Sequence, residues 1–531
     1  MLKHLQLNQT KAALILFFLF MIQMVCYNYQ TILTTYPRTI HAWRQADCLN
    51  FTLNYYNNRA TFFEPRVNNI SNYGDSKTAS DFPLVQYTVA QIWKLFGKSI
   101  TLFRLIDLGF LLLGLLYVFK LCYYWTKDYF ISITTTVLLY TSPILAYYGP
   151  SFINEIQAFG LGCAGFYFTI KWLEEKKRKQ FIAIVLLFLF AGLAKVSVFF
   201  VYAIALLLIG KNFLESFKTC NRQQKKKWFL NLFLLLVPIA VSLSWSAYAA
   251  CYNSMHYNLF LVGIVPAWGI DKERKHLILT QLFDDTLPQM FNSALLVVIF
   301  VFVVAYLITH IKQFFSSTYL TVLSGFALFF SYILLFFQNL GVHDYYFIVL
   351  LMIVFILLCL GIKHINEIYP WVFKKSITRV AVVFLIILLT YQTTVKTRVR
   401  VDYTKESSWQ CMILNKQKIE LYQFLIWEDR ARFAELENIA PNLEAMHVAK
   451  NDTVLVLGDL FSTRSLGIID RVGYTGFNTL YEDVPKFIDA RKKHGLKYLF
   501  VLDPELLKDE KLKPYLKNKL FLRNSTSIYK L

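Results

Sequence analysis

The first 400 residues of this 531-residue chain consist largely of long apolar stretches separated by short charged ones. A helix needs about 20 apolar residues to cross the roughly 30 Å hydrocarbon core of a bilayer. We therefore predict about eleven transmembrane helices, near residues 12–29, 101–124, 129–147, 153–172, 181–195, 196–210, 228–249, 291–310, 318–337, 344–362 and 377–394. Lys195 interrupts an otherwise continuous apolar run, so we expect a tight helical hairpin there.

Charged residues are concentrated in the last quarter of the chain. Residues 401–531 hold 38 of the 89 Asp, Glu, Lys and Arg residues, although the whole chain is only 17% charged. An ordinary soluble domain is about 25% charged, so the composition argues against a soluble enzyme. The predicted fold class is an all-α polytopic membrane bundle over residues 1–400, with long outside loops at 30–100 and 250–290, followed by a small α/β soluble domain over 401–531.

The C-terminal part carries a β-α-β pattern. Residues 452–458 and 497–503 are short apolar runs bounded by turn residues, which is typical of buried strands, and 484–493 between them has helical character. A further strand is expected at 527–530, giving a partly parallel sheet. Because no glycine-rich phosphate loop follows the first strand, we do not expect nucleotide binding.

The basic residues indicate the orientation of the bundle. If the N-terminus is cytoplasmic, the short inside loops hold seventeen Lys and Arg residues, and the short outside turns at 148–152 and 338–343 hold none. The C-terminal domain then lies outside. The net charge of +21 is thus an orientation signal and a surface for anionic membrane lipids, and nucleic acid is not needed as a partner. The composition fits a bacterial inner membrane, with the outside being periplasm.

The first long outside loop is the most informative segment. Apolar and aromatic residues recur at helical spacing over 43–56 and again over 83–96, so we expect two amphipathic helices along the membrane interface. Charged residues lie on and between them, among them Arg44, Asp47, Arg66 and Asp81. Such charges at the surface of a bundle are placed to meet the headgroup of a membrane lipid.

These residues resemble a known family. Arg44-Gln45-Ala46-Asp47, Glu64-Pro65-Arg66 and Asp81-Phe82-Pro83, then Ser142-Pro143, Asn154-Glu155, Gly192, Lys195 and His343-Asp344-Tyr345-Tyr346, follow one another as in GT-C glycosyltransferases of the protein mannosyltransferase and aminoarabinose transferase type. The resemblance covers about residues 10 to 395. This chain has Ala46 where the family has the first acid of an Asp-Glu pair, and Phe82 where it has a lysine, so another cation must hold the lipid phosphate.

The resemblance implies an inverting transferase that moves a sugar from a polyprenyl-phosphate donor to a lipid, glycan or protein acceptor. Displacing a phosphate leaving group requires a base near the sugar and positive charge near the phosphate. Asp47 is the candidate base, and Asp81 and Glu155 are candidates for holding a divalent metal ion or positioning the acceptor. Arg44, Arg66 and Lys195 are the phosphate candidates. The resemblance adds His343 and Tyr345 as substrate-binding residues.

Each candidate also has a purely structural interpretation. Asp47 can pair with Arg44, Asp81 can cap the following helix, Glu155 can complement a helix dipole and Lys195 can reach the interface.

Two other functions compete with the transferase. A transporter or lipid flippase is less favoured, because no internal repeat is evident and the charges cluster at one membrane face. An inactive family member that serves as an assembly subunit also fits the departures from the family pattern.

Overall fold

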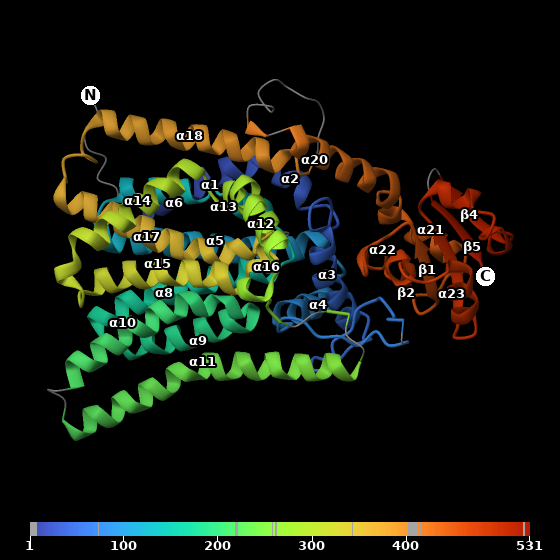
Figure 1. Ribbon diagram of the computed structural model, residues 1–531, viewed down its shortest axis with the longest axis horizontal. Helices are drawn as coiled ribbons and strands as arrows, with labels where there is room; N and C mark the ends of the chain where they lie inside the picture. The colour runs from blue at the N-terminus through green and yellow to red at the C-terminus, as the bar shows by residue number, and fades with distance from the viewer. Residues whose placement is uncertain are drawn as a thin grey trace.

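The computed structural model describes residues 8–72, 74–217, 221–256, 259–260, 263–341, 343–401, 413–414, 416–523 and 526–531. A bundle of long helices forms one end of the molecule, and a small domain built on a five-stranded sheet forms the other (Figure 1). This is the fold class that the sequence predicts.

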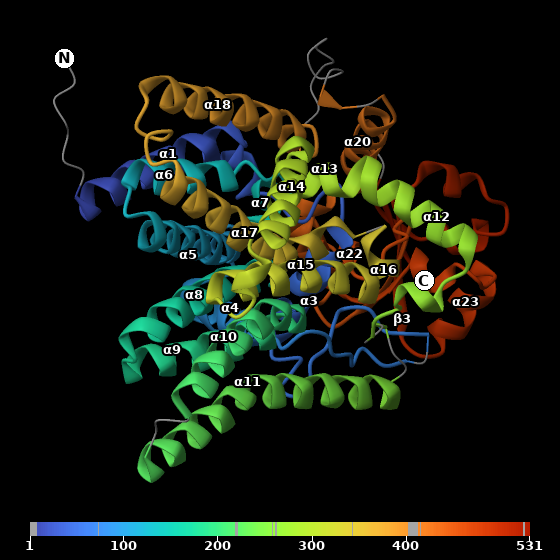
Figure 2. The same ribbon diagram turned by 60° about the vertical axis from the view of Figure 1, so that its left-hand side comes forward.

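All eleven predicted stretches fall on helices. The bundle is built from α1 (Gln9–Cys26), α5 (Ile100–Thr126), α6 (Tyr129–Leu139), α7 (Pro143–Tyr148), α8 (Asn154–Glu175), α9 (Arg178–Ala194), α10 (Phe199–Phe217), α11 (Arg222–Met255), α14 (Ser293–Thr309), α15 (Ser317–Leu335), α17 (Phe347–Ile368) and α18 (Ser376–Arg398). Helices α18 and α11 lie on opposite sides of the bundle in both views (Figures 1 and 2).

Fewer than eleven of these helices can cross a membrane on length and composition alone. Within the described ranges, seven qualify, and an eighth results if α12 (Lys272–Gln281) and α13 (Leu287–Met290) are joined to α14 across a bend of 96°. The others are too short or too polar: α6 has 11 residues, α9 and α14 have 17 each, and α8 carries charges at both ends. These helices pack against their neighbours in the bundle: α8 packs against α5 and α9, and α6 packs against α5.

Helix α17 forms the centre of the bundle. Its sequence is apolar all round, and 83% of its most apolar window is buried, as expected for a helix surrounded by others. Close packing nearby depends on Gly160 of α8, where a Cβ would lie 2.2 Å from the carbonyl oxygen of Phe110 on α5. At the predicted break, α9 ends at Ala194, Lys195 is extended, and α10 begins after a single turn.

The first loop contains both predicted helices, α3 (Ala42–Tyr56) and α4 (Leu84–Phe96), after the short α2 (Tyr29–Ile32). Helix α3 differs from the expected half-exposed helix, because almost all of its residues are buried. The reason is tertiary: the bundle covers one side of α3 and the C-terminal domain covers the other (Figure 1).

The C-terminal domain follows α20 (Lys416–Glu428) and α21 (Ala440–Ala445). Its strands β1 (Thr453–Leu457), β2 (Val472–Thr475), β3 (Leu496–Val501), β4 (Lys519–Arg523) and β5 (Thr526–Lys530) are ordered β2-β1-β3-β5-β4. Strand β1 is parallel to β2 and β3, and β5 is antiparallel to β3 and β4, which confirms a partly parallel sheet.

Helices cover both faces of this sheet. Val454 and Val456 pack in one core with residues of α22 (Arg464–Ile469), whereas Leu455 and Leu457 pack in another with residues of α23 (Val484–Lys492). This alternation follows from the two-residue period of a strand.

The outer edge of β2 pairs with the first loop of the bundle. Asn69 forms a parallel bridge with Gly473, whose N–H donates to the carbonyl of Asn68. Gly473 is required there, because a Cβ would lie 1.9 Å from the carbonyl oxygen of Val454. The loop that carries the candidate site is thereby attached to the sheet.

Candidate functional site

Four charged side chains from four segments meet at the end of the bundle beside α3. Arg44 Nη2 lies 2.6 Å from Asp81 Oδ2 and 3.8 Å from Glu155 Oε1. Lys195 Nζ lies 3.2 Å from Asp81 Oδ2 and 2.9 Å from Glu155 Oε1. Two cations and two carboxylates therefore form one continuous cluster, and we refer to these four residues as the charged cluster.

The local structure explains how each side chain reaches the cluster. Arg44 is in the first turn of α3, Asp81 is in the loop just before α4, and Glu155 is in the first turn of α8. Lys195 is extended, with φ −156° and ψ 115°, between α9 and α10. Each residue thus lies at a helix end, where the chain leaves the bundle.

The cluster is buried but its members differ in exposure. The side chain of Glu155 is 0% exposed, whereas that of Asp81 is 19% exposed. Burial of charges is expensive unless each one is paired, and here the positive and negative charges balance. Although burial opposes it, the positive charges of Lys195 and Arg44 lower the pKa of Asp81, so Asp81 is ionised at neutral pH.

Asp47 lies one helical turn beyond Arg44 on α3. It is 2% exposed, and its Oδ1 accepts a hydrogen bond of 2.7 Å from Thr463 Oγ1 of the C-terminal domain. Burial raises the pKa of Asp47 to about 7, against the opposing effects of the Thr463 hydrogen bond and the charge of Arg44. A carboxyl with such a pKa can take up a proton at neutral pH.

Aromatic rings border the charged cluster. The ring centroid of His343 lies 5.3 Å from that of Trp43, and His41 lies 5.2 Å from Tyr345. Lys195 Nζ lies 5.1 Å from the centre of the Tyr346 ring. His343 Nδ1 is buried and has no hydrogen-bond partner among the described residues. The structure thus brings His343 and Tyr345 next to the charged residues.

Among the described residues, Arg66 makes no ion pair with the charged cluster. Its backbone forms an isolated antiparallel bridge with Lys77, and its charge acts on nearby Tyr252 of α11. We therefore leave Arg66 out of the proposed site.

The structure decides between some of the simpler interpretations. Asp81 does not cap α4, since Pro83 is the N-cap residue and no side-chain hydrogen bond is made there. Asp47 hydrogen bonds to Thr463 instead of forming an ion pair with Arg44. Glu155 does lie in the first turn of α8, but it also pairs with Lys195. A role confined to helix ends therefore does not account for these three acids.

Asp81 and Glu155 do not fit a divalent-metal site. Both face Arg44 and Lys195, so side-chain cations occupy the position beside these carboxylates. Across the described ranges, no group of three or more His, Cys, Asp or Glu residues is arranged to hold a metal ion. Calcium and magnesium ions prefer six or more oxygen ligands, and two carboxylates already paired with cations do not supply them.

A second buried group was not expected from the sequence. Asp344 accepts hydrogen bonds from Tyr148 (2.6 Å) and Arg400 (3.1 Å) and lies 3.3 Å from His41 Nε2. Of these residues, only Arg400 could have been singled out from the sequence, because it is a charged residue just beyond the last apolar stretch. Thr463, the partner of Asp47, could not have been identified from the sequence, since it lies in a short polar segment 416 residues away from Asp47.

An apolar cavity begins beside the charged cluster. It has a volume of about 230 Å³ and is lined by Phe82, Leu84, Val85, Phe110, Gln157, Leu161, Phe190, Leu193 and Ala194. Phe82 follows Asp81 in the chain, and Ala194 precedes Lys195. The cavity lies between α4, α5, α8 and α9, and two of its lining residues are direct chain neighbours of the charged cluster.

Comparison with known proteins shows a shared fold. No family profile and no curated protein matches the sequence. The structure is similar to ArnT from Cupriavidus metallidurans in the apo state, with a TM-score of 0.56 and 11% identity over 98% of both chains. It is equally similar to ArnT bound to undecaprenyl phosphate, at a TM-score of 0.56 and 12% identity over 97% of both chains.

A third similar structure is an oligosaccharyltransferase from Archaeoglobus fulgidus in complex with zinc and sulfate. The TM-score is 0.50 at 13% identity, over 91% of this chain and 67% of that one. Together these structures show that the chain has the GT-C type of fold.

Proposed function

We propose that this protein, with its GT-C fold, transfers a sugar from a polyprenyl-phosphate carrier to an acceptor hydroxyl, with inversion at the sugar. The transfer takes place at the periplasmic face of the inner membrane. The observation that carries the proposal is the charged cluster itself, in which two cations meet near an apolar cavity lined by the chain neighbours of Asp81 and Lys195, with an acid of raised pKa one helical turn from Arg44. A lipid phosphate needs the same combination of positive charge and apolar surface.

The phosphate is held by Arg44 and Lys195. Arg44 offers a planar fork of donors, and Lys195 offers a compact positive charge. Asp81 is the more exposed of the two acids that pair with them, so the phosphate approaches from the side of Asp81 and shares both cations with it. Glu155, fully buried, keeps Lys195 in place. Apolar residues beginning at Phe82 receive the first part of the lipid chain.

Asp47 is the base. The acceptor oxygen attacks the anomeric carbon from the face opposite the phosphate, and its proton passes to the carboxylate of Asp47. The bond between the anomeric carbon and the phosphate oxygen breaks, and the electron pair leaves with the phosphate. Arg44 and Lys195 stabilise the charge that develops on that oxygen. A single displacement of this kind inverts the sugar.

The first test concerns capture of the lipid. Replacing Lys195 with methionine should weaken binding of undecaprenyl phosphate and raise the donor KM at least about tenfold, because the proposed contact exists before and during transfer. Lys94→Met is the matched control, since Lys94 is exposed and its Nζ donates to Asn58. Equal binding by Lys195→Met and the native protein would contradict the phosphate site.

Loss of Lys195 also leaves two buried carboxylates with one cation, which typically costs about 3 to 5 kcal/mol. The double variant Lys195→Met with Asp81→Asn removes one charge of each sign and should restore thermal stability but not lipid binding. Lipid binding restored together with stability would show that Lys195 has only a structural role.

The second test concerns the reaction. The native protein in membranes that contain the natural acceptor should release polyprenyl phosphate from one of a panel of polyprenyl-phosphate sugars. Asp47→Asn should abolish this release. If the native protein releases none from any donor, the transferase proposal fails, and a role as an inactive assembly subunit is favoured.

A further inference from the structure

A hydrogen bond links the C-terminal domain to Asp47 of the first loop. Thr463 Oγ1 donates to Asp47 Oδ1 at 2.7 Å, and the two residues are 0% and 2% exposed. Thr463 is the residue just before α22. The domain thus supplies a donor inside the site, although the sequence assigns the site to the bundle.

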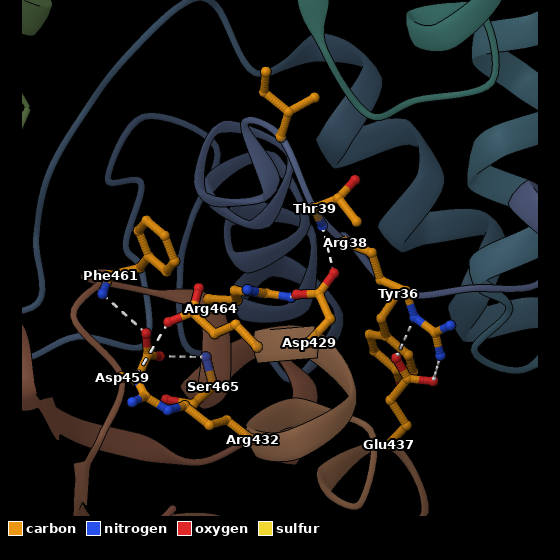
Figure 3. A network of polar contacts seen from close by, with 12 residues as sticks. Tyr36, Arg38, Thr39, Asp429, Arg432, Glu437, Asp459, Phe461, Arg464 and Ser465 are labelled. Carbon is orange, nitrogen blue, oxygen red and sulfur yellow. Dashed lines mark hydrogen bonds and ion pairs between the residues drawn. The ribbon is translucent and has the colours of Figure 1, made fainter. Parts of the chain in front are cut away.

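The segment around Thr463 is held by its own acid. Asp459 is fully buried, and its Oδ1 accepts from the N–H of Phe461 at 2.9 Å while its Oδ2 accepts from the N–H of Ser465 at 2.8 Å. Thr463 lies between these two anchored residues. Figure 3 shows both hydrogen bonds at the base of the segment. The loop from Asp459 to Ser465 is therefore closed on itself and presents Thr463 in a defined position.

The same segment is bound to α3. Asn50, one turn beyond Asp47, donates its Nδ2 to the carbonyl of Thr463 at 3.0 Å. Asn68, in the loop after α3, donates to the carbonyl of Leu466 in α22 at 3.0 Å. A Cβ on Gly467 would lie 2.5 Å from Asn50 Nδ2, so a larger residue there would force the Asn50 amide to move. These contacts fix the distance between α22 and α3 independently of the Thr463 hydroxyl.

A second attachment lies further along the interface. The N–H of Thr39 donates to Asp429 Oδ2 at 2.6 Å, and Asp429 also pairs with Arg464, the residue after Thr463 (Figure 3). Arg38 binds the carboxylate of Glu437 through a bidentate pair of hydrogen bonds, with lengths of 3.1 and 2.7 Å. The domain is thus attached to the loop on both sides of Thr463.

We propose that Thr463 is a positioning residue for the transfer reaction, which holds the carboxylate of Asp47 by Oδ1 so that Oδ2 takes the proton of the acceptor. The proposal rests on the function proposed above. Because a donated hydrogen bond favours the ionised carboxylate, Thr463 also lowers the pKa of Asp47 and so increases the fraction in the basic form at neutral pH. The C-terminal domain is therefore part of the site and not only a cap on the bundle.

The test compares three purified variants. Thr463→Val removes the hydroxyl and keeps the shape, and Thr463→Ser keeps the hydroxyl. Thr479→Val is the matched control, because the Thr479 hydroxyl donates to the Gly476 carbonyl within the same domain. For Thr463→Val we expect kcat to fall about tenfold with little change in the donor KM, and the acid limb of the kcat profile to move up by about one pH unit. Thr463→Ser should restore both.

A second readout does not need the reaction. Thermal stability is measured from pH 4.5 to 9 for Thr463→Val in the native background and in the Asp47→Asn background. In the native background, Thr463→Val should raise the pH at which the loss of stability is complete, because Asp47 then titrates at a higher pH. In the Asp47→Asn background, Thr463→Val should cause no such shift. If no donor is turned over, the transferase proposal fails while this comparison still tests the Thr463 contact. An unchanged pH profile in Thr463→Val, or an equal shift in Thr479→Val, would overturn the role of Thr463.

Discussion

Replacing Asp47 with asparagine should make the protein more stable and inactive at the same pH. The substitution keeps the size of the side chain and its ability to accept the Thr463 hydrogen bond, but it removes the buried charge. Burial raises the pKa of Asp47 from its ordinary value of 3.8 to about 7 in the folded protein. At about 1.36 kcal/mol per unit, ionised Asp47 costs about 4 kcal/mol of folding free energy.

The sign of the pH dependence follows from these two values. Below about pH 4 the carboxyl is protonated in both the folded and the unfolded chain, and its charge costs nothing. As the pH rises from about 4 to about 7, the unfolded chain releases this proton first, so the native protein loses stability. Above about pH 7 the full cost remains. The stability of Asp47→Asn should lack this fall, and the two proteins should differ most at pH 8.

Thermal unfolding in detergent at pH 4.5, 6, 7 and 8 measures the difference. A change of about 4 kcal/mol is roughly 3 to 4 °C in Tm for a chain of this length. Sugar transfer should fall by about 10²- to 10⁴-fold, the typical contribution of a positioned base. A variant that is less stable than the native protein at pH 8 would refute the reasoning, because it would mean that the carboxylate is held by a favourable ion pair. Native activity in Asp47→Asn would remove the base from the mechanism.

Two further predictions concern the interface and the topology. Gly467→Ala should lower the free energy of unfolding by about 1 to 3 kcal/mol in chemical or thermal unfolding, because the new Cβ would overlap Asn50, whereas Gly210→Ala, which meets open space within α10, should be neutral or slightly stabilising. Equal effects of the two substitutions would argue against a close approach of α22 to α3. Reporter fusions after Lys179 and after Arg400 should lie in opposite compartments, with the second outside, and a shared compartment would contradict the orientation.

The sequence predicted those features that depend on local patterns. Hydropathy located all eleven apolar segments of the bundle, and helical spacing located α3 and α4. Alternation and turn residues located β1, β3 and β5. Strand β2 was missed because it has four residues and includes a glycine, and β4 was missed because most of its residues are exposed and the strand lacks a buried face.

The charged cluster was predicted in part for the same reason. Arg44, Asp81, Glu155 and Lys195 each lie at a helix end next to an apolar run, where a charge is conspicuous. Their pairing with one another was not predictable, since it requires the positions of four helices. The interpretation of Asp81 and Glu155 as metal ligands did not include Arg44 and Lys195, which lie within ion-pair distance of one oxygen of each carboxylate. Arg66 looked equivalent to Arg44 in the sequence, but the loop takes it toward Lys77.

The raised pKa of Asp47 depends on both ends of the chain. An aspartate on a helix at the membrane interface would be solvated and acidic, and the amphipathic pattern of α3 predicts such an exposed position. The pKa rises because α3 is buried, and α3 is buried because the bundle covers one side of it and the C-terminal domain covers the other, through Asn50 of α3 and through Asn68 of the following loop, which bonds to Leu466 and Gly473. The same packing delivers Thr463, whose hydrogen bond limits the rise. The domain therefore both raises the basicity of Asp47 by excluding water and keeps it ionisable near neutral pH, and this balance is what a proton acceptor in a transfer reaction requires.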